Sequence, residues 1–252
     1  MNIKNPELIQ KLATFKPLFQ LKPTIVATGQ FIPVDWSRGV IQEPEILKLM
    51  AKEFFRLIDF SIIDVVAGIE LQGVTLATAI ALETGKPMVI VREKPKRPGR
   101  SPIVGDVNFI SAGVRVLLVD DLMAYGGTKE ERIKLLEERG AKVTDIAVFI
   151  KVLPTPPNKP LIPSYNFKAA EWLQERGIGL HYLIDYPELA RLQLAAGVIS
   201  QELCEIEQKN SDGPYWERGE NLLRVYKLMK KEGVPIEEFV VQFMKEHGVE
   251  VS

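Results

Sequence analysis

An apolar run that ends in two carboxylates constrains the fold of this chain more than any other feature. Residues 114–128 read Val-Arg-Val-Leu-Leu-Val-Asp-Asp-Leu-Met-Ala-Tyr-Gly-Gly-Thr, and a strongly helical segment follows them. The apolar run is typical of a buried strand, and the segment after the glycine turn is typical of a helix. A strand followed by a helix in this way favours an α/β fold.

The two halves of this motif predict a ligand. In open α/β sheets, ligands bind beyond the carboxyl ends of the strands, where Asp120 and Asp121 would lie. Carboxylates there can hold hydroxyl groups or a hydrated cation. The turn at 124–128 offers successive backbone N–H groups and a helix N-terminus, which attract phosphate. A ribose 5-phosphate would satisfy both halves of the motif.

Two other interpretations of the same residues remain open. A buried parallel strand can be followed by two aspartates and a glycine turn for structural reasons alone. The run also resembles the strand of an ATPase that ends in acidic residues, but the chain contains no G-x-x-x-x-G-K-[ST] phosphate loop. The ATPase interpretation therefore lacks a nucleotide site.

Helical and strand-like segments alternate through the first 150 residues. We expect a helix at 43–57, a strand at 62–67, a helix that ends near Thr84 before Gly85, a strand at 87–91, a strand at 114–119, a helix at 128–139 and a strand at 142–150. Alternation at this spacing predicts a parallel sheet with right-handed crossovers.

The segments on either side of this core differ from it. Residues 19–23 and 30–36 look like two short extended pieces of a small hood, at about 1–40, over the sheet. Residues 152–163 contain five prolines and should end the sheet. Only helices are expected beyond them, at 167–176, 187–196, 200–209, 216–232 and 235–247. The predicted division is a core with its hood at 1–164 and a C-terminal helical region at 165–252.

Charge and cysteine content limit the partners and the compartment. The 252 residues include 32 basic and 33 acidic side chains, a net charge of −1, so no overall field would recruit nucleic acid or an anionic membrane. The single cysteine, Cys204, fits a reducing compartment. The N-terminus lacks the pattern of a signal peptide, and no apolar run reaches the roughly 20 residues of a membrane helix. We expect a cytoplasmic protein that binds neither nucleic acid nor membranes.

Two further segments could bind phosphate. The turn at 68–73 follows the first core strand and would face the same ligand edge, although glycine is common there for turn geometry alone. Residues 91–100 place five cations after a strand, which is typical either of a solvated surface loop or of a basic lid over a polyphosphate. Two anion-binding turns and a lid would suit a ligand with two phosphorylated ends.

With these three segments the chain resembles the type I phosphoribosyltransferases. Residues 116–128 are similar to that family's signature for phosphoribosyl pyrophosphate. The resemblance implies a Rossmann-like parallel sheet, and it implies that Asp120 and Asp121 hold the ribose 2′- and 3′-hydroxyls. The other implied contacts are Ala124, Tyr125, Gly126, Gly127 and Thr128 for the 5′-phosphate, Glu70, Leu71, Gln72 and Gly73 for the pyrophosphate, and Arg92 and Lys96 of the lid.

Within the family the chain looks most like the orotate-specific branch. Arg92, Lys96 and Gly99 fall on that branch's lid pattern R-K-x-x-K-x-H-G, and Phe19-Gln-Leu-Lys22 looks like its N-terminal F-T-L-K segment. Only about 28 residues separate Arg92 from Asp120, and residues 169–183 are similar to the helix and short strand that follow the core. The resemblance covers roughly residues 15–216 and leaves a helical extension at about 217–252 unmatched.

The departures from the branch pattern cluster where the base is chosen. Pro98 replaces the lid histidine, and Glu93 replaces a lysine. The D-R-x-x-x-G stretch whose arginine binds the orotate carboxylate is absent, and Lys151-Val-Leu-Pro stands in its place. Pro98 and Met123-Ala124 lean toward the adenine-type members. A purine therefore remains an alternative to orotate.

The implied reaction is transfer of a 5-phosphoribosyl group from phosphoribosyl pyrophosphate to a nucleobase, with release of pyrophosphate. Asp120 and Asp121 would lie near the cationic sugar, Lys96 would be the main lid cation, and Lys22 of the hood could meet the base or a phosphate. Mg²⁺ would be held mainly by substrate and water rather than by direct protein ligands. The resemblance also implies a homodimer.

Two alternatives concern other functions. Some proteins of this fold bind the same donor as regulators without catalysis, although this chain shows no helix-turn-helix signal. The C-terminal helices could also be a partner-binding module attached to an active enzyme.

Overall fold

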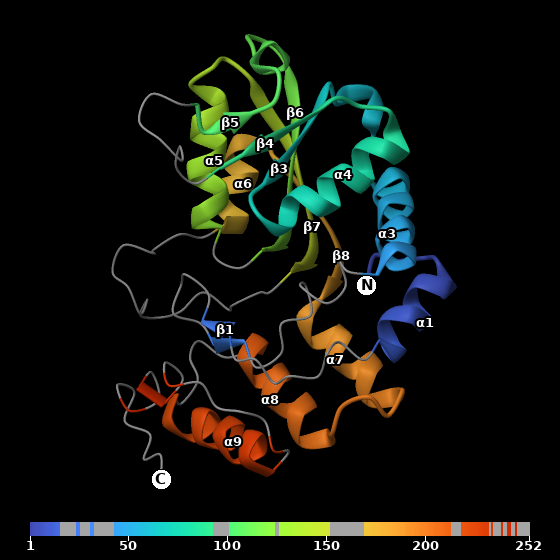
Figure 1. The fold of residues 1–252 in the computed structure, drawn as a ribbon, viewed down its shortest axis with the longest axis vertical. Coiled ribbons are helices and arrows are strands. Elements are labelled where there is room, and N and C mark those ends of the chain that lie inside the picture. Colours follow the sequence, from blue (N-terminus) through green and yellow to red (C-terminus); the bar gives the residue numbers. More distant parts are fainter. Residues whose placement is uncertain are drawn as a thin grey trace.

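The computed structural model describes residues 1–15, 24, 25, 31, 32, 43–92, 101–123, 126–151, 169–212 and 218–231, with single positions at 233, 238, 241, 242 and 245. Within these residues a central sheet lies between two layers of helices, and further helices pack beyond one end of the sheet (Figure 1).

The sheet has six strands in the order β5-β4-β3-β6-β7-β8. They are β3 (Val65–Ile69), β4 (Met88–Val91), β5 (Ile103–Val104), β6 (Arg115–Met123), β7 (Lys142–Lys151) and β8 (Gly179–Asp185). All neighbouring strands are parallel except β4 and β5. The predicted α/β fold with a mostly parallel sheet is confirmed.

Helices cover both faces of the sheet. The pair α3 (Pro44–Leu57) and α4 (Gln72–Thr84) lies on one side, and α5 (Gly127–Glu137) and α6 (Ala169–Arg176) lie on the other (Figure 1). Each side has its own apolar cluster, and alternate residues of β6 contribute to the two clusters. Because both faces are covered, β3 is buried at every position, as expected for a parallel strand.

The predicted segments of the core correspond closely to these elements. The predicted helix at 43–57 is α3, and the helix that was expected to end at Gly85 is α4, whose C-cap Gly85 has a φ of 69°. Short 3₁₀ helices at Phe60–Ile62 and Val107–Phe109 precede β3 and β6, so the first core strand starts three residues later than predicted.

The expectation that only helices follow residue 163 was wrong. Strand β8 is an outermost strand of the sheet and pairs in parallel with β7. The family resemblance had implied a short strand there. Only glycine fits at position 179, because a Cβ there would clash with the Asp145 carboxylate at 2.5 Å. That carboxylate is hydrogen-bonded to His181 at 2.8 Å. Side-chain pairing between β7 and β8 therefore fixes a strand whose apolar pattern is short.

An N-terminal helix and an antiparallel strand were not predicted. In α1 (Pro6–Thr14) the Asn5 side chain accepts hydrogen bonds from the backbone N–H groups of Glu7 and Leu8. Leu8 and Leu12 are buried in the same apolar cluster as α3. The antiparallel strand is β5, which has only two residues and so gives little signal in the sequence.

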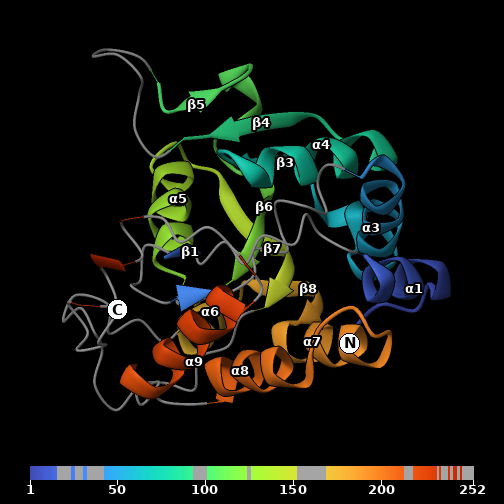
Figure 2. The same ribbon diagram turned by 60° about the horizontal axis from the view of Figure 1, so that its bottom comes forward.

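Three helices, α7 (Tyr186–Ala195), α8 (Gln201–Asp212) and α9 (Arg218–Lys231), lie beyond one end of the sheet (Figures 1 and 2). Leu203 and Tyr226 share an apolar cluster with residues of α3 and α4. The helix predicted at 235–247 lies mostly outside the described residues. No helix in the part of the chain that the structure describes is long and apolar enough to cross a lipid bilayer.

The predicted hood is described only at two short strands. β1 (Thr24–Ile25) and β2 (Phe31–Ile32) form an antiparallel pair, with Thr24 opposite Ile32 and Ile25 opposite Phe31. The predicted extended piece at 19–23, including Lys22, lies outside the described residues.

Candidate active site

The first acidic residue of the motif, Asp120, is buried in the second half of β6, three residues before the strand ends at Met123, with 7% of its surface exposed. Alternation along the strand places it on the same face as Val116 and Leu118, which pack in the cluster that includes α5. Its Oδ2 lies 2.5 Å from the Nζ of Lys129, and its Oδ1 accepts a 3.0 Å hydrogen bond from the backbone N–H of Asp121. Both oxygens of this carboxylate therefore have partners within the protein.

Asp121 occupies a different environment. It is half-buried, and alternation along β6 places it on the other face of the sheet. Its Oδ1 accepts a 2.9 Å hydrogen bond from the backbone N–H of Leu122. Asp120 is therefore the enclosed residue and Asp121 the more accessible one, while the ribose-binding role predicted for both stays a prediction.

The predicted pyrophosphate loop lies directly against Asp120. A Cβ on Gly73 would lie 2.5 Å from the carbonyl oxygen of Val119 and 3.0 Å from Oδ1 of Asp120. These distances are shorter than van der Waals contact, so only glycine fits at the start of α4. The loop after β3 and the acidic end of β6 are therefore parts of one site.

The rest of this loop is tied to the neighbouring strand on one side. The backbone N–H of Glu70 donates to the carbonyl of Val91 at 3.0 Å, and the peptide bond between Glu70 and Leu71 is cis. Leu71 is 76% exposed, while Gln72 begins α4. The loop thus exposes Leu71, while the backbone of Glu70 is hydrogen-bonded to β4.

Arg92, the first residue of the predicted lid, lies beside this loop. Its Nε is 3.5 Å from Oε2 of Glu70, and its backbone N–H donates to the carbonyl of Pro102 at 2.9 Å. The structure therefore brings Arg92 and the pyrophosphate loop together. Lys96 lies outside the described residues.

The predicted phosphate turn ends at the N-terminus of α5. Gly126 is buried and has a φ of 83°, a conformation that glycine adopts without strain, and α5 begins at Gly127. The next residue, Thr128, is exposed at the first turn. A helix N-terminus therefore lies beyond Asp120 and Asp121, as the motif predicted, while Ala124 and Tyr125 lie outside the described residues.

A match to a known domain decides the family. Residues 41–170, just over half of the chain, match the model of the phosphoribosyl transferase domain. The chain belongs to the phosphoribosyltransferase family. The matched residues include Gly73, Arg92, Asp120 and Asp121, and the fold is that of the type I members.

Curated relatives include both orotate and adenine phosphoribosyltransferases. The orotate phosphoribosyltransferase of Pyrococcus furiosus is 36% identical over 167 residues, which cover 65% of this chain and 81% of the relative. The adenine phosphoribosyltransferase of Butyrivibrio fibrisolvens is 34% identical over 126 residues, 45% of this chain and 70% of the relative. The orotate phosphoribosyltransferases of Thermococcus gammatolerans, Pyrococcus abyssi and Thermococcus kodakarensis are 41–45% identical over 114–119 residues, and the chain spans only 58–62% of their length.

Solved structures show the same fold. The UMP synthase of Leishmania donovani superposes with a TM-score of 0.59 at 22% identity, over 81% of this chain and 41% of that chain. At this identity the likeness concerns the fold alone.

One charged residue of the candidate site was missed from the sequence. Lys129 is the third residue of α5, and it is only 5% exposed because its side chain reaches Asp120. In the sequence it resembles an ordinary surface lysine. The available signal was its position, since a cation in the first turn of a helix opposes the helix dipole.

A second missed residue is Lys151 at the carboxyl end of β7. Its Nζ lies 3.1 Å from Oδ1 of Asp185, at the end of β8, and 3.9 Å from the centre of the Tyr182 ring. Burial opposes its charge, but the contacts with Tyr182 and Asp185 outweigh burial and raise the pKa of Lys151. A stable cation therefore lies at the same edge of the sheet as Asp120.

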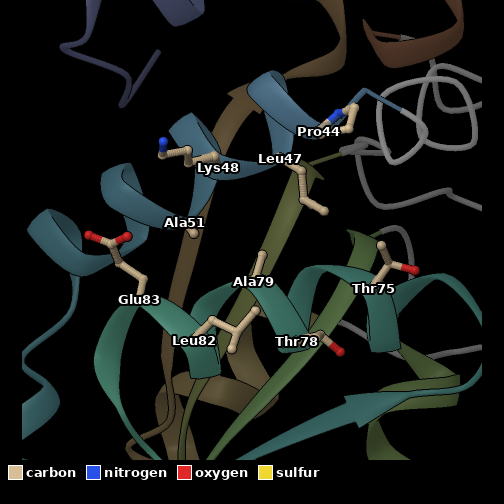
Figure 3. Close-up of a pocket in the computed structure, with 9 residues that line it drawn as sticks. All are labelled: Pro44, Leu47, Lys48, Ala51, Thr75, Thr78, Ala79, Leu82 and Glu83. Carbon is tan, nitrogen blue, oxygen red and sulfur yellow. The ribbon is translucent and has the colours of Figure 1, made fainter.

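A pocket of about 460 Å³ lies elsewhere, between α3 and α4 (Figure 3). Leu47 and Ala51 of α3 face Ala79 and Leu82 of α4 across it (Figure 3). None of the predicted site residues lines this pocket. The candidate active site is therefore defined by the strand ends and their loops.

Proposed function

We propose that the protein transfers a 5-phosphoribosyl group from phosphoribosyl pyrophosphate to a nucleobase, with orotate as the base and orotidine 5′-monophosphate and pyrophosphate as products. The observation that carries the proposal is the packing of Gly73 against Asp120. It brings a loop suited to a pyrophosphate into contact with the acidic pair suited to a ribose.

The proposed roles follow the geometry. Asp121, the more accessible carboxylate, accepts hydrogen bonds from the ribose hydroxyls, and the N-terminus of α5 binds the 5′-phosphate. The loop at 70–73 binds the pyrophosphate with help from Arg92. The transition state separates a cationic sugar from an anionic leaving group, so groups fixed on the two sides stabilise it more than the ground state.

Mg²⁺ fits this arrangement as an ion held mainly by the substrate. No cluster of three or more His, Cys, Asp or Glu side chains among the described residues could hold a metal ion. A magnesium ion of this kind keeps several waters and would be held mainly by phosphate oxygens of the substrate rather than by direct protein ligands. When bound, the ion neutralises charge on the leaving pyrophosphate.

Two observations bear on the base. The likeness to the Pyrococcus furiosus orotate enzyme extends over 65% of this chain, while the likeness to the adenine enzyme covers 45%. Lys151 supplies a cation at the strand end where this chain lacks the arginine of the orotate pattern, and an acidic base such as orotate would pair with it. We therefore favour orotate and keep a purine as the second candidate because of Pro98 and Met123-Ala124.

The remaining proposals come from the sequence. Lys96 acts as the main lid cation, Lys22 contacts the base or a phosphate, and the enzyme works as a homodimer in the cytoplasm. The segment at 217–252 is unmatched, and the alternative is that it is a partner-binding module attached to an active enzyme. The test of that alternative is whether deletion of 217–252 leaves activity and oligomeric state unchanged.

Turnover of single bases tests the proposal. The purified protein is incubated with Mg²⁺ and phosphoribosyl pyrophosphate, and orotate, uracil, adenine, guanine, hypoxanthine or xanthine is added singly. Pyrophosphate release and nucleotide formation with orotate alone support the proposed reaction. Turnover of adenine alone would assign the protein to the purine branch, and donor binding without turnover of any base would favour a regulator.

A further inference from the structure

Lys129 lies at a position of α5 that is unfavourable for a lysine. It lies in the first turn of α5, where the helix dipole disfavours a cation, and its side chain is only 7% exposed. Burial of an ammonium group is costly unless it is paired. The 2.5 Å contact with Oδ2 of Asp120 supplies the partner.

The Asp120 carboxylate is held on three sides. Lys129 contacts Oδ2, and the backbone N–H of Asp121 donates to Oδ1. Gly73 packs so close that a Cβ added to it would lie 3.0 Å from Oδ1. The side chain of Asp120 is only 10% exposed. Of these three contacts, only the ion pair with Lys129 links α5, the helix that follows the phosphate turn, to the acidic residues of β6.

The pairing also changes the charge that a ligand meets. Asp120 and Asp121 are adjacent, and two ionised carboxylates would repel a ligand that carries a phosphate and a pyrophosphate. Lys129 neutralises the buried member of the pair, and Asp121 is the less buried carboxylate. The lysine therefore acts on both the position and the charge of this end of the site.

We propose that Lys129 is a positioning residue for binding of the phosphoribosyl donor, which fixes and neutralises Asp120 between the Gly73 loop and the first turn of α5. This inference rests on the proposed function. Lys129 acts through Asp120, so it should govern the affinity for phosphoribosyl pyrophosphate more than the rate of the chemical step.

The test compares four variants with the wild-type protein. Lys129→Met removes the charge and keeps the length, Lys129→Arg keeps the charge, and Asp120→Asn and the double variant Asp120→Asn/Lys129→Met complete a cycle. Lys134→Met is the matched control, because Lys134 lies on the same helix, is 55% exposed and pairs with Glu130. The readouts are donor binding by calorimetry with Mg²⁺, KM for the donor and the base, and kcat.

Lys129→Met should raise the Kd and KM for the donor about tenfold or more and change kcat and the KM for the base less than about threefold. Lys129→Arg should recover most of the affinity, and Lys134→Met should match the wild type. In the Asp120→Asn background, removal of Lys129 should have little further effect on donor binding.

Wild-type donor affinity in Lys129→Met, or the same loss of affinity in both backgrounds, would overturn the inference. If Lys129→Met does not fold because it leaves Asp120 unpaired, Asp120→Asn and the double variant decide the question, since both lack the buried carboxylate. They should then bind the donor equally, and a weaker double variant would also overturn the inference. A wild-type protein that does not bind the donor refutes the proposed function and not the pairing.

Discussion

Gly73 packs so closely against Asp120 that a single added carbon would lie 3.0 Å from the aspartate carboxylate and 2.9 Å from its Cα. The first residue belongs to the start of α4 and the second to the carboxyl-terminal half of β6. This contact links two loops that are 47 residues apart in the sequence. Substitutions on either side of it should therefore affect the same ligand.

Gly73→Ala should weaken donor binding. The new methyl group would meet the backbone of Val119 and Asp120, which cannot move aside as a side chain can, so the start of α4 must shift. We expect kcat/KM for phosphoribosyl pyrophosphate to fall about tenfold or more and the free energy of unfolding to fall by about 1–3 kcal/mol. Leu82→Ala, at a position of the same helix that is 82% exposed, should change neither. Unchanged kinetics in Gly73→Ala would show that the two loops act separately.

The two aspartates should respond differently to the same substitution. Asp121→Asn should lower kcat/KM about 100-fold with little effect on stability, because the residue is half-buried and proposed to meet the ribose. Asp120→Asn leaves the buried Lys129 without its charged partner, so the free energy of unfolding should fall by about 2–4 kcal/mol as well. Denaturant unfolding and steady-state kinetics on both variants check this difference, and equal losses of stability would contradict it.

Lys151→Met should affect the base and not the donor. If Lys151 pairs with an acidic base, its removal should raise the KM for orotate about tenfold and leave the KM for phosphoribosyl pyrophosphate within about threefold. Lys142→Met is the control, because Lys142 is exposed at the opposite end of the same strand. Steady-state kinetics with each substrate varied in turn measure both constants. An unchanged KM for orotate would exclude Lys151 from the base site.

The burial of Glu207 should make the stability of the protein depend on pH. This residue of α8 is fully buried, and burial raises the pKa of its carboxyl to about 8 although a hydrogen bond with Tyr186 acts in the opposite direction. The folded state therefore keeps the proton that the unfolded state loses at acidic pH. The stabilisation is complete below the ordinary pKa of glutamate and declines as the pH rises toward about 8.

Glu207→Gln should remove this decline. The variant should match the wild type near pH 4.5 and be more stable at pH 8 by an amount on the order of 2–5 kcal/mol. Denaturant unfolding at several pH values measures the difference. Glu205→Gln, whose side chain is 48% exposed on the same helix, should show less than about 1 kcal/mol at any pH. A wild-type curve that is flat between pH 5 and 8 would show that Glu207 is ionised in the folded protein.

The sequence predicted most of the core because its signals are local. The apolar runs at β3, β4, β6 and β7 and the glycines at 85 and 140 mark strand and helix ends without reference to distant residues. Strand β8 and the short β5 carry weaker local patterns. Pairing with β7 and β4 holds these two strands in the sheet. Their local patterns alone revealed neither strand, and only the family resemblance at 169–183 implied a short strand near β8.

The same distinction applies to the site. The order of strand, acidic pair, glycine turn and helix was sufficient to predict where Asp120, Asp121 and Gly126 would lie, because each follows from chain direction in a parallel sheet. Only the tertiary structure decided that Asp120 is enclosed by Lys129 while Asp121 is more accessible. That choice depends on which helix covers each face of β6 and on how closely Gly73 approaches it, and packing between distant segments sets both.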